Sequence, residues 1–133
     1  MRSRIMVGTL LVVGLLGVGT LASRATEISG PRHWTLVHFM NPVTVQGRVV
    51  MGPVLIVHDD EKMAKGEACT TFYRFDPSRG PREEIVSFHC KPAERALADV
   101  TTFTTVNTQD TACKKLVEYQ IAGETEAHGI PAK

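Results

Sequence analysis

Five side chains with soft nitrogen or sulfur donor atoms could do chemistry in this chain: His58, Met63, Cys69, Cys90 and His128. Imidazole, thiolate and thioether groups suit Cu(I) or Zn, so these residues are candidate ligands of a copper or zinc ion. His58 ends an apolar run, and Cys69 begins an aromatic one. If the two runs are neighbouring antiparallel strands, His58 and Cys69 lie close together across the 59–68 loop. The most economical site therefore contains His58, Cys69 and Cys90, with Met63 or His128 as a further ligand.

Cys69 and Cys90 have a competing use, which is a disulfide bond. They begin and end an expected hairpin whose connection is residues 76–83. If Asp76 faces Glu83, the same register places Cys69 opposite Cys90, within reach of a disulfide. Closing this loop would stabilise the fold by about 3 kcal/mol. We favour the disulfide, since no close spacing such as Cys-x-x-Cys supports the metal site, and we keep the metal site as the alternative.

Three other features are weaker candidates. Cys113 is an odd cysteine followed by two lysines that would favour its thiolate, yet a half-buried, inert thiol is the simpler expectation. The acidic residues 59–61 lack the glycine and glutamate that an EF-hand loop needs further along, so they are expected to form a solvated turn. His89 should point to the opposite face of its strand from Cys90.

The N-terminal residues indicate where the protein acts. Arg2 and Arg4 precede an uncharged stretch, residues 5–23, and small residues follow at its end. This order is typical of a secretory signal peptide, here residues 1–25, which leaves residues 26–133 as a single domain. The stretch is also long enough for an uncleaved anchor, the only contact with a membrane that we expect. In both cases the domain is extracytoplasmic, periplasmic or secreted, where disulfides persist.

The mature part has the periodicity of strands. Short segments rich in β-branched and aromatic residues alternate with Gly, Pro, Asn and Asp, a pattern that predicts an all-β domain. We expect a small antiparallel β-sandwich or barrel-like domain. At most one or two short helices are expected, over residues 61–68 and 92–99. Residues 53–58 form a continuous apolar run and should be buried on both faces of the sheet.

Residues 37–57 also resemble the opening of a group of short, uncharacterised exported bacterial β proteins. In that group a strand ends at Asn/Pro, and Val-x-Val-x-Gly-Arg/Lys-Val leads into a glycine turn and another strand. The positions that match are turn and core formers: Pro42, Val43, Val45, Gly47, Arg48, Val49 and Gly52. The group commonly continues with a Gly-Thr-Tyr-like turn, where this chain has Gly52-Pro53-Val54. The resemblance implies an exported β fold and no particular activity.

Several functional classes are not supported. Known motifs for acyl transfer, phosphate binding or zinc proteolysis are missing from the sequence, so catalysis is not expected. Without Arg2, Arg4 and Arg24 the chain is slightly acidic and has no basic run, which argues against nucleic-acid binding. The sequence therefore predicts a non-catalytic exported domain with a structural or interaction role, an unknown protein partner and no cofactor. The alternative is a small extracytoplasmic copper- or zinc-binding protein.

Overall fold

The computed structural model describes residues 32–109 and 112–133, so the predicted signal segment, residues 1–25, lies outside the described residues. The described chain forms eight strands and one short helix. These are β1 (Arg32–Val45), β2 (Arg48–Asp59), α1 (Asp60–Ala64), β3 (Thr70–Asp76), β4 (Gly80–Phe88), β5 (Lys91–Glu94), β6 (Thr102–Val106), β7 (Lys114–Gln120) and β8 (Glu126–Gly129). The predicted all-β class is confirmed. No helix in the described ranges is long and apolar enough to cross a membrane.

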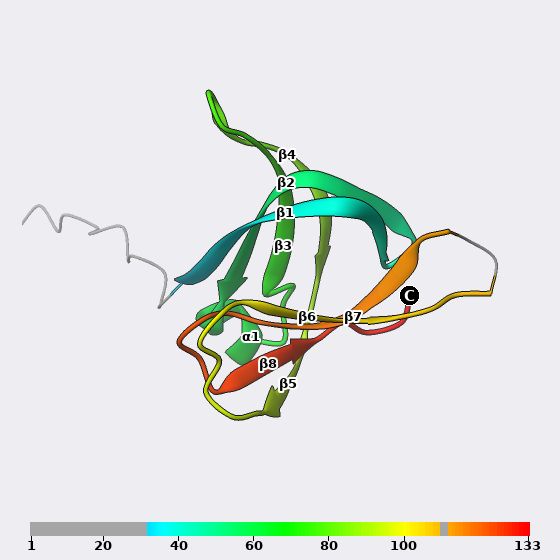
Figure 1. Cartoon of the computed structure of the whole chain (residues 1–133). Helices are drawn as coiled ribbons and strands as arrows, with labels where there is room; N and C mark the ends of the chain where they lie inside the picture. Colours follow the sequence, from blue (N-terminus) through cyan, green and yellow to red (C-terminus); the bar gives the residue numbers. More distant parts are fainter. Residues whose placement is uncertain (1–31, 110–111) are drawn as a thin grey trace, which may run out of the picture.

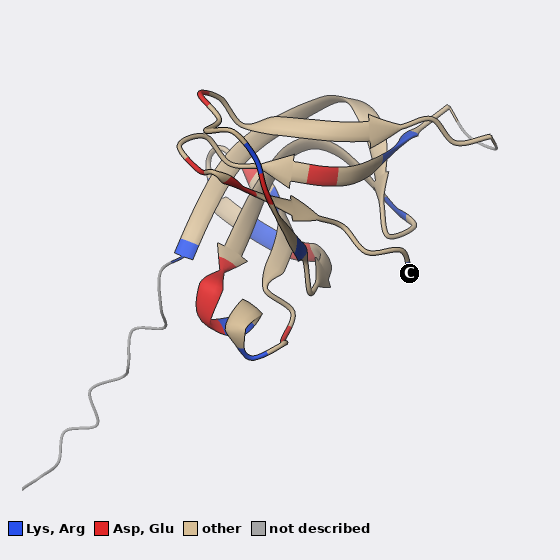
Figure 2. Ribbon diagram, turned by 90° about the horizontal axis from the view of Figure 1, so that it is seen from below, with Lys and Arg blue, Asp and Glu red and all other residues tan. Residues whose placement is uncertain are grey.

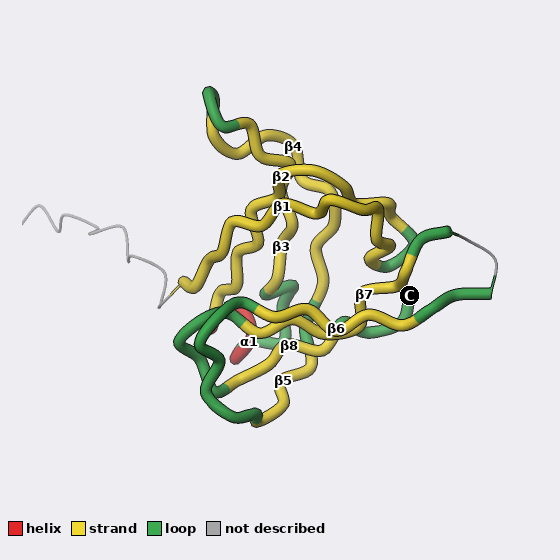
Figure 3. The backbone as a smooth tube through the Cα atoms, in the orientation of Figure 1, coloured by secondary structure: helices red, strands yellow, loops and turns green. Residues whose placement is uncertain are grey.

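All eight strands belong to one curled sheet, which makes the fold barrel-like (Figure 1). The strand order is β4-β3-β2-β1-β7-β8-β5, and β6 pairs with β7 off this path. Only β1 and β7 pair in parallel; the other pairs are antiparallel. β4 and β5 lie at opposite ends of the strand order, yet only His89 and Cys90 separate them in the chain. The sheet must therefore curl until its two ends are close together, as the tube in Figure 3 shows.

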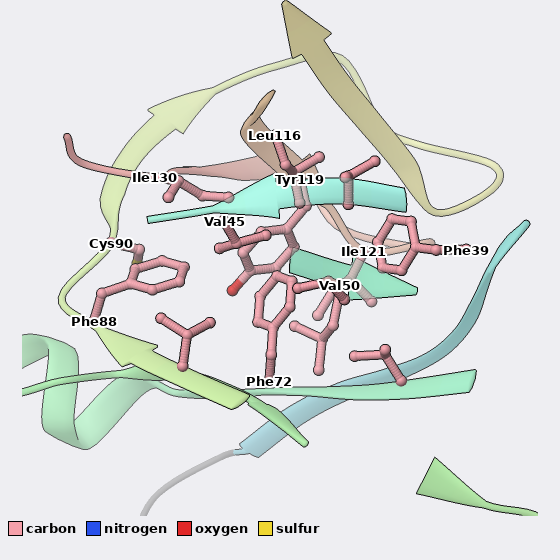
Figure 4. Close-up of a cluster of buried hydrophobic side chains, with 14 of the residues drawn as sticks. Phe39, Val45, Val50, Phe72, Phe88, Cys90, Leu116, Tyr119, Ile121 and Ile130 are labelled. Carbon is pink, nitrogen blue, oxygen red and sulfur yellow. The ribbon is translucent and has the colours of Figure 1, made fainter. Parts of the chain in front are cut away.

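The core fills the inside of the curl. Phe72 and Phe88 pack beneath Tyr119, and Cys90 lies at the edge of this cluster beside Phe88 (Figure 4). In β2 the inward residues Val54 and Ile56 are fully buried. Their neighbours, such as Leu55, are only half-buried. The expectation that residues 53–58 are buried on both faces is therefore wrong, because the outer face of this strand is only partly covered.

The predicted register of the β3–β4 hairpin is also wrong. The Asp76 carboxylate accepts hydrogen bonds from the backbone N–H groups of Ser78 and Arg79, at 2.7 and 3.2 Å. This tightens the turn, so that Asp76 pairs with Gly80 instead of Glu83.

Irregularities in the pairing between residues 72 and 75 then reduce the difference from the predicted register. At the end of the hairpin away from the turn, Thr70 pairs with Phe88. The buried face of β3 consequently carries Thr70 and Phe72, whereas Thr71 and Tyr73 face outward and are half-buried. The pairing differs by one residue from the predicted one at this end, and a shift of one residue exchanges the two faces of a strand.

One of the two expected helices is present. α1 overlaps the region, residues 61–68, where a helical turn is expected, and the Asp59 carboxylate caps it by accepting the Lys62 N–H. The other is wrong: residues 92–99 do not form a helix, because Lys91–Glu94 form β5 and pair with β8. Pro92 is tolerated there since β5 is at the edge of the sheet.

The inward and outward faces of β2 can be tested with one pair of variants. Ile56→Ala should lower the free energy of unfolding by about 2–5 kcal/mol, because it opens a cavity in the core. Leu55→Ala, one residue away on the half-buried face, should lower it clearly less. Urea unfolding followed by circular dichroism measures both. Equal losses would contradict the assignment of the two faces.

Candidate metal centre

The sulfur of Cys90 is the centre of a buried group of donor atoms. Cys69 Sγ lies 3.2 Å from it, His58 Nε2 3.4 Å, His128 Nδ1 3.6 Å and Met63 Sδ 3.8 Å. We call these five residues the soft-donor cluster. Both cysteines and both histidines are buried, and Met63 is partly buried against the core. The structure thus brings together all five residues that the sequence singled out as candidate ligands.

The ends of two paired strands position His58 and Cys69. His58 pairs with Thr70 across β2 and β3, which places Cys69 beside the end of β2. The Asp59 N–H then donates a 2.8 Å hydrogen bond to the Cys69 carbonyl and closes the intervening loop. Strand alternation directs the side chain of His58 inward, along with Ile56.

Cys90 reaches the cluster from the short link between β4 and β5. The backbone N–H of Cys90 donates to Cys69 Sγ at 3.2 Å, a contact that a metal-bound thiolate also accepts. Cys69 and Cys90 are therefore neighbours even though the register predicted for them is wrong. The structure confirms that the two cysteines are close together. Both are free thiols, and no bond joins their sulfur atoms. The predicted disulfide stays a prediction.

His128 and Met63 complete the cluster from β8 and from α1. His128 is on β8, where its ring stacks on Tyr119 with the ring centroids 4.9 Å apart. The Tyr119 hydroxyl is fixed by a 2.7 Å hydrogen bond to Thr70 Oγ1. Met63 is presented by α1, whose N-terminus is held by the Asp59 cap.

The spacing of the donors matches what a single ion requires. A tetrahedral ion about 2.3 Å from sulfur and about 2.0–2.1 Å from nitrogen holds sulfur and nitrogen ligands about 3.5 Å apart. The two sulfur–nitrogen distances at Cys90 are 3.4 and 3.6 Å. The donor atoms of His58, Cys69 and Cys90 all lie within 4.8 Å of one another, so this trio forms the most compact group. His128 and Met63 join it through Cys90.

Each histidine of the cluster has a carboxylate near its other nitrogen. His58 Nδ1 lies 3.1 Å from Asp60 Oδ1, and His128 Nε2 lies 3.2 Å from Glu124 Oε2. His33 links the two acids, with its nitrogens 3.0 Å from Asp60 Oδ2 and 2.7 Å from Glu124 Oε1. Carboxylates in this position orient metal-binding histidines and raise their basicity.

Two of these contacts are short but poorly directed. Among the described residues, His58 Nδ1 and Glu124 Oε1 are the buried side-chain polar atoms that lack a hydrogen bond. We therefore regard the Asp60–His58 and His33–Glu124 approaches as close polar contacts without a hydrogen bond. Unsatisfied buried polar atoms are uncommon, and both of these lie next to the soft-donor cluster.

Burial controls the protonation of the cluster. It lowers the pKa of His58 to about 4, with a smaller effect of the same sign from His128, so His58 is neutral at pH 7 and its lone pair is available. Burial also lowers the pKa of His128. Burial, followed by the hydrogen bond with Cys69, raises the pKa of the Cys90 thiol to about 12. A cation in the cluster would reverse this effect, because metal binding drives thiols to thiolates.

The remaining sequence candidates lie elsewhere or have different contacts. His89 is exposed, and its Nδ1 lies 2.8 Å from the Glu67 carbonyl oxygen and 3.8 Å from Cys69 Sγ, so it borders the cluster at Cys69 and has no contact with the Cys90 sulfur. Cys113 is half-buried, at the start of β7 and outside the cluster. Asp60 is not simply part of a solvated turn, since it contacts both His33 and His58.

Sequence reasoning missed the roles of His33, Asp60 and Glu124. The signal for His33 was the β1–β2 hairpin, in which His33 pairs directly with His58.

Comparisons with protein families, curated proteins and solved structures find no match for this chain. The case for a function therefore depends on the geometry of the cluster.

The buried histidines predict a specific pH dependence for the metal-free, reduced protein. The folded pKa of His58 is below its unfolded value of 6.5, so the unfolded state binds the proton first as the pH falls. Stability should be full above about pH 6.5 and fall by up to about 3 kcal/mol by pH 4, with His128 adding in the same direction.

Urea unfolding at a series of pH values measures this effect. His58→Gln should have a shallower loss of stability between pH 6.5 and 4, whereas His38→Gln, on the exposed face of β1, should keep the wild-type slope. A wild-type protein with no extra loss over this interval would contradict a buried, neutral His58.

Proposed function

We propose that this protein binds one transition-metal ion, Cu(I) or Zn, through His58, Cys69 and Cys90, with His128 or Met63 as the fourth ligand. The observation that carries the proposal is the convergence of all four other donor atoms within 3.8 Å of the buried Cys90 sulfur. Two thiolates, two imidazoles and a thioether make a soft set that suits these ions.

The surroundings of the cluster support an ion over an ordinary core. Burying two neutral imidazoles and two thiols beside unsatisfied polar atoms costs free energy unless something compensates for it. Apolar side chains of similar volume would fill the same space without that cost. An ion that bonds to the sulfur and nitrogen atoms supplies the compensation directly, since the binding free energy adds to folding.

A disulfide-stabilised structural domain explains less of the arrangement. Such a bond would use Cys69 and Cys90 but give no role to the buried His58 and His128. It would also leave the two carboxylates behind those histidines without a purpose. The disulfide is accordingly the competing oxidised form of the same two sulfurs.

The proposed role is binding and not catalysis. Catalytic zinc sites keep one coordination position open, whereas closed sites have four protein ligands. His58, Cys69 and Cys90 supply three ligands, and either His128 or Met63 supplies the fourth, so no position is left open. The predicted signal segment supports a location outside the cytoplasm, and the role that we propose is storage or transport of the ion in that compartment.

Metal content of the intact protein tests the proposal. Protein purified without oxygen and with reductant should bind one equivalent of Cu(I) or Zn under native mass spectrometry. Cys90→Ser should abolish binding, because Cys90 contacts every other ligand, and Cys113→Ser should bind like the wild type. If the reduced wild type binds no ion, or if Cys90→Ser binds as well as the wild type, the proposal is wrong.

The oxidised protein gives a second, independent measurement. Treatment with oxidised glutathione should lower the denatured mass by about 2 Da if the pair forms a disulfide. This form should take up no metal, since both thiolate ligands are lost. Addition of reductant should restore binding. Full binding by the disulfide form would show that the ion does not use these sulfurs.

A further inference from the structure

A pocket of about 390 Å³ opens directly onto two members of the soft-donor cluster. Met63 and His128 belong to its lining, whereas Cys69 and Cys90 do not. Met63 is the more exposed of the two, since His128 is almost fully buried. An ion in the cluster is thus separated from solvent on this side chiefly by the thioether of Met63.

The other residues of this lining make it acidic. Asp60, Glu124 and Glu126 contribute carboxylates, and His33 lies between the first two of them. No lysine or arginine belongs to the described lining. Acidic residues begin α1 at this place, visible as the red segment that leads into the helix in Figure 2. A cleft lined by one sign of charge concentrates ligands of the opposite sign and raises their association rates.

We propose that this pocket, which we call the exchange port, is where a positively charged partner with a soft sulfur donor delivers or removes the ion, and that Met63 is the ligand that it exchanges first. The proposal rests on the proposed function, because an exchange port requires a bound ion. The partner is recognised by two properties: a thiol or thioether that competes for the ion, and cationic groups that match the three carboxylates.

The exchange is a ligand substitution with no change in oxidation state. An incoming thiolate forms a bond to Cu(I) as the bond from Met63 breaks, and a second incoming thiolate displaces the deeper ligands. Protons released by the incoming thiols balance those taken up by Cys69 and Cys90 as their thiolates become thiols again.

The role of Met63 is tested by the rate at which Cu(I) leaves the loaded protein. Met63→Leu conserves volume and should keep both the fold and the Cu(I) stoichiometry. Cysteamine removes the Cu(I), and the absorbance of the thiolate-to-copper band in a stopped-flow instrument measures the rate. In this variant the rate of removal should change several-fold. Met51→Leu, on the exposed face of β2, should exchange at the wild-type rate.

The acidity of the port is tested by the charge of the competing thiol. Compared at equal thiolate concentration, cationic cysteamine should remove Cu(I) roughly tenfold faster than anionic 3-mercaptopropionate, and added salt should reduce the difference. Glu126→Gln should also reduce it. Glu84→Gln, on β4 and outside the lining of the port, should leave it unchanged.

The outcomes separate the two proposals. A reduced protein that takes up neither Cu(I) nor Zn overturns both, and one that takes up Zn alone overturns the port. A loaded protein whose Met63→Leu variant exchanges at the wild-type rate, or which shows no preference for the cationic thiol, binds the ion but does not exchange it through this port. A changed rate in Met63→Leu together with a salt-sensitive preference for cysteamine supports the port.

Discussion

The contact of Cys90 with four other donor atoms is the interaction on which the rest of this structure depends. A buried sulfur with two imidazoles, a second thiol and a thioether around it is a poor way to fill a hydrophobic core. It becomes favourable when a positive charge is added, because the same low dielectric that penalises an isolated thiolate strengthens its attraction to a cation. The elevated pKa of Cys90 and the depressed pKa of His58 are two consequences of one cause, which is desolvation.

The curl of the sheet makes this contact possible. Cys90 lies in the two-residue link between β4 and β5, and these strands occupy opposite ends of the strand order. Donors from the β2 end, from α1 and from β8 can meet there only because the sheet brings its ends together. The aromatic side chains of Phe72, Phe88 and Tyr119 pack inside the curl, and the ring of His128 stacks on Tyr119. Packing and ligand geometry are therefore coupled.

The sequence was informative where chemistry depends on residue type and weak where it depends on register. The all-β class, the helical turn after His58 and the donor set could all be predicted from composition and local spacing. The pairing of β3 with β4 could not, because it depends on how Asp76 hydrogen-bonds within the turn and on irregularities between residues 72 and 75. The carboxylate behind His128 was missed for a related reason. Glu124 and His128 reach the soft-donor cluster only after β8 has paired with β7, a contact that no local pattern specifies.

The distance between the two cysteine sulfurs shows why the fold permits two forms of the cluster. At 3.2 Å it is longer than a disulfide bond of about 2.05 Å and shorter than the separation of about 3.8 Å across a tetrahedral ion. Either form therefore needs only a small movement of the link at Cys90. What would differ is the fate of the histidines: a disulfide would leave His58 and His128 buried against an apolar sulfur pair, while an ion would take its nitrogen ligands from them. The free energy of burying these imidazoles would thus favour a metal-bound form whenever reducing conditions keep the thiols available.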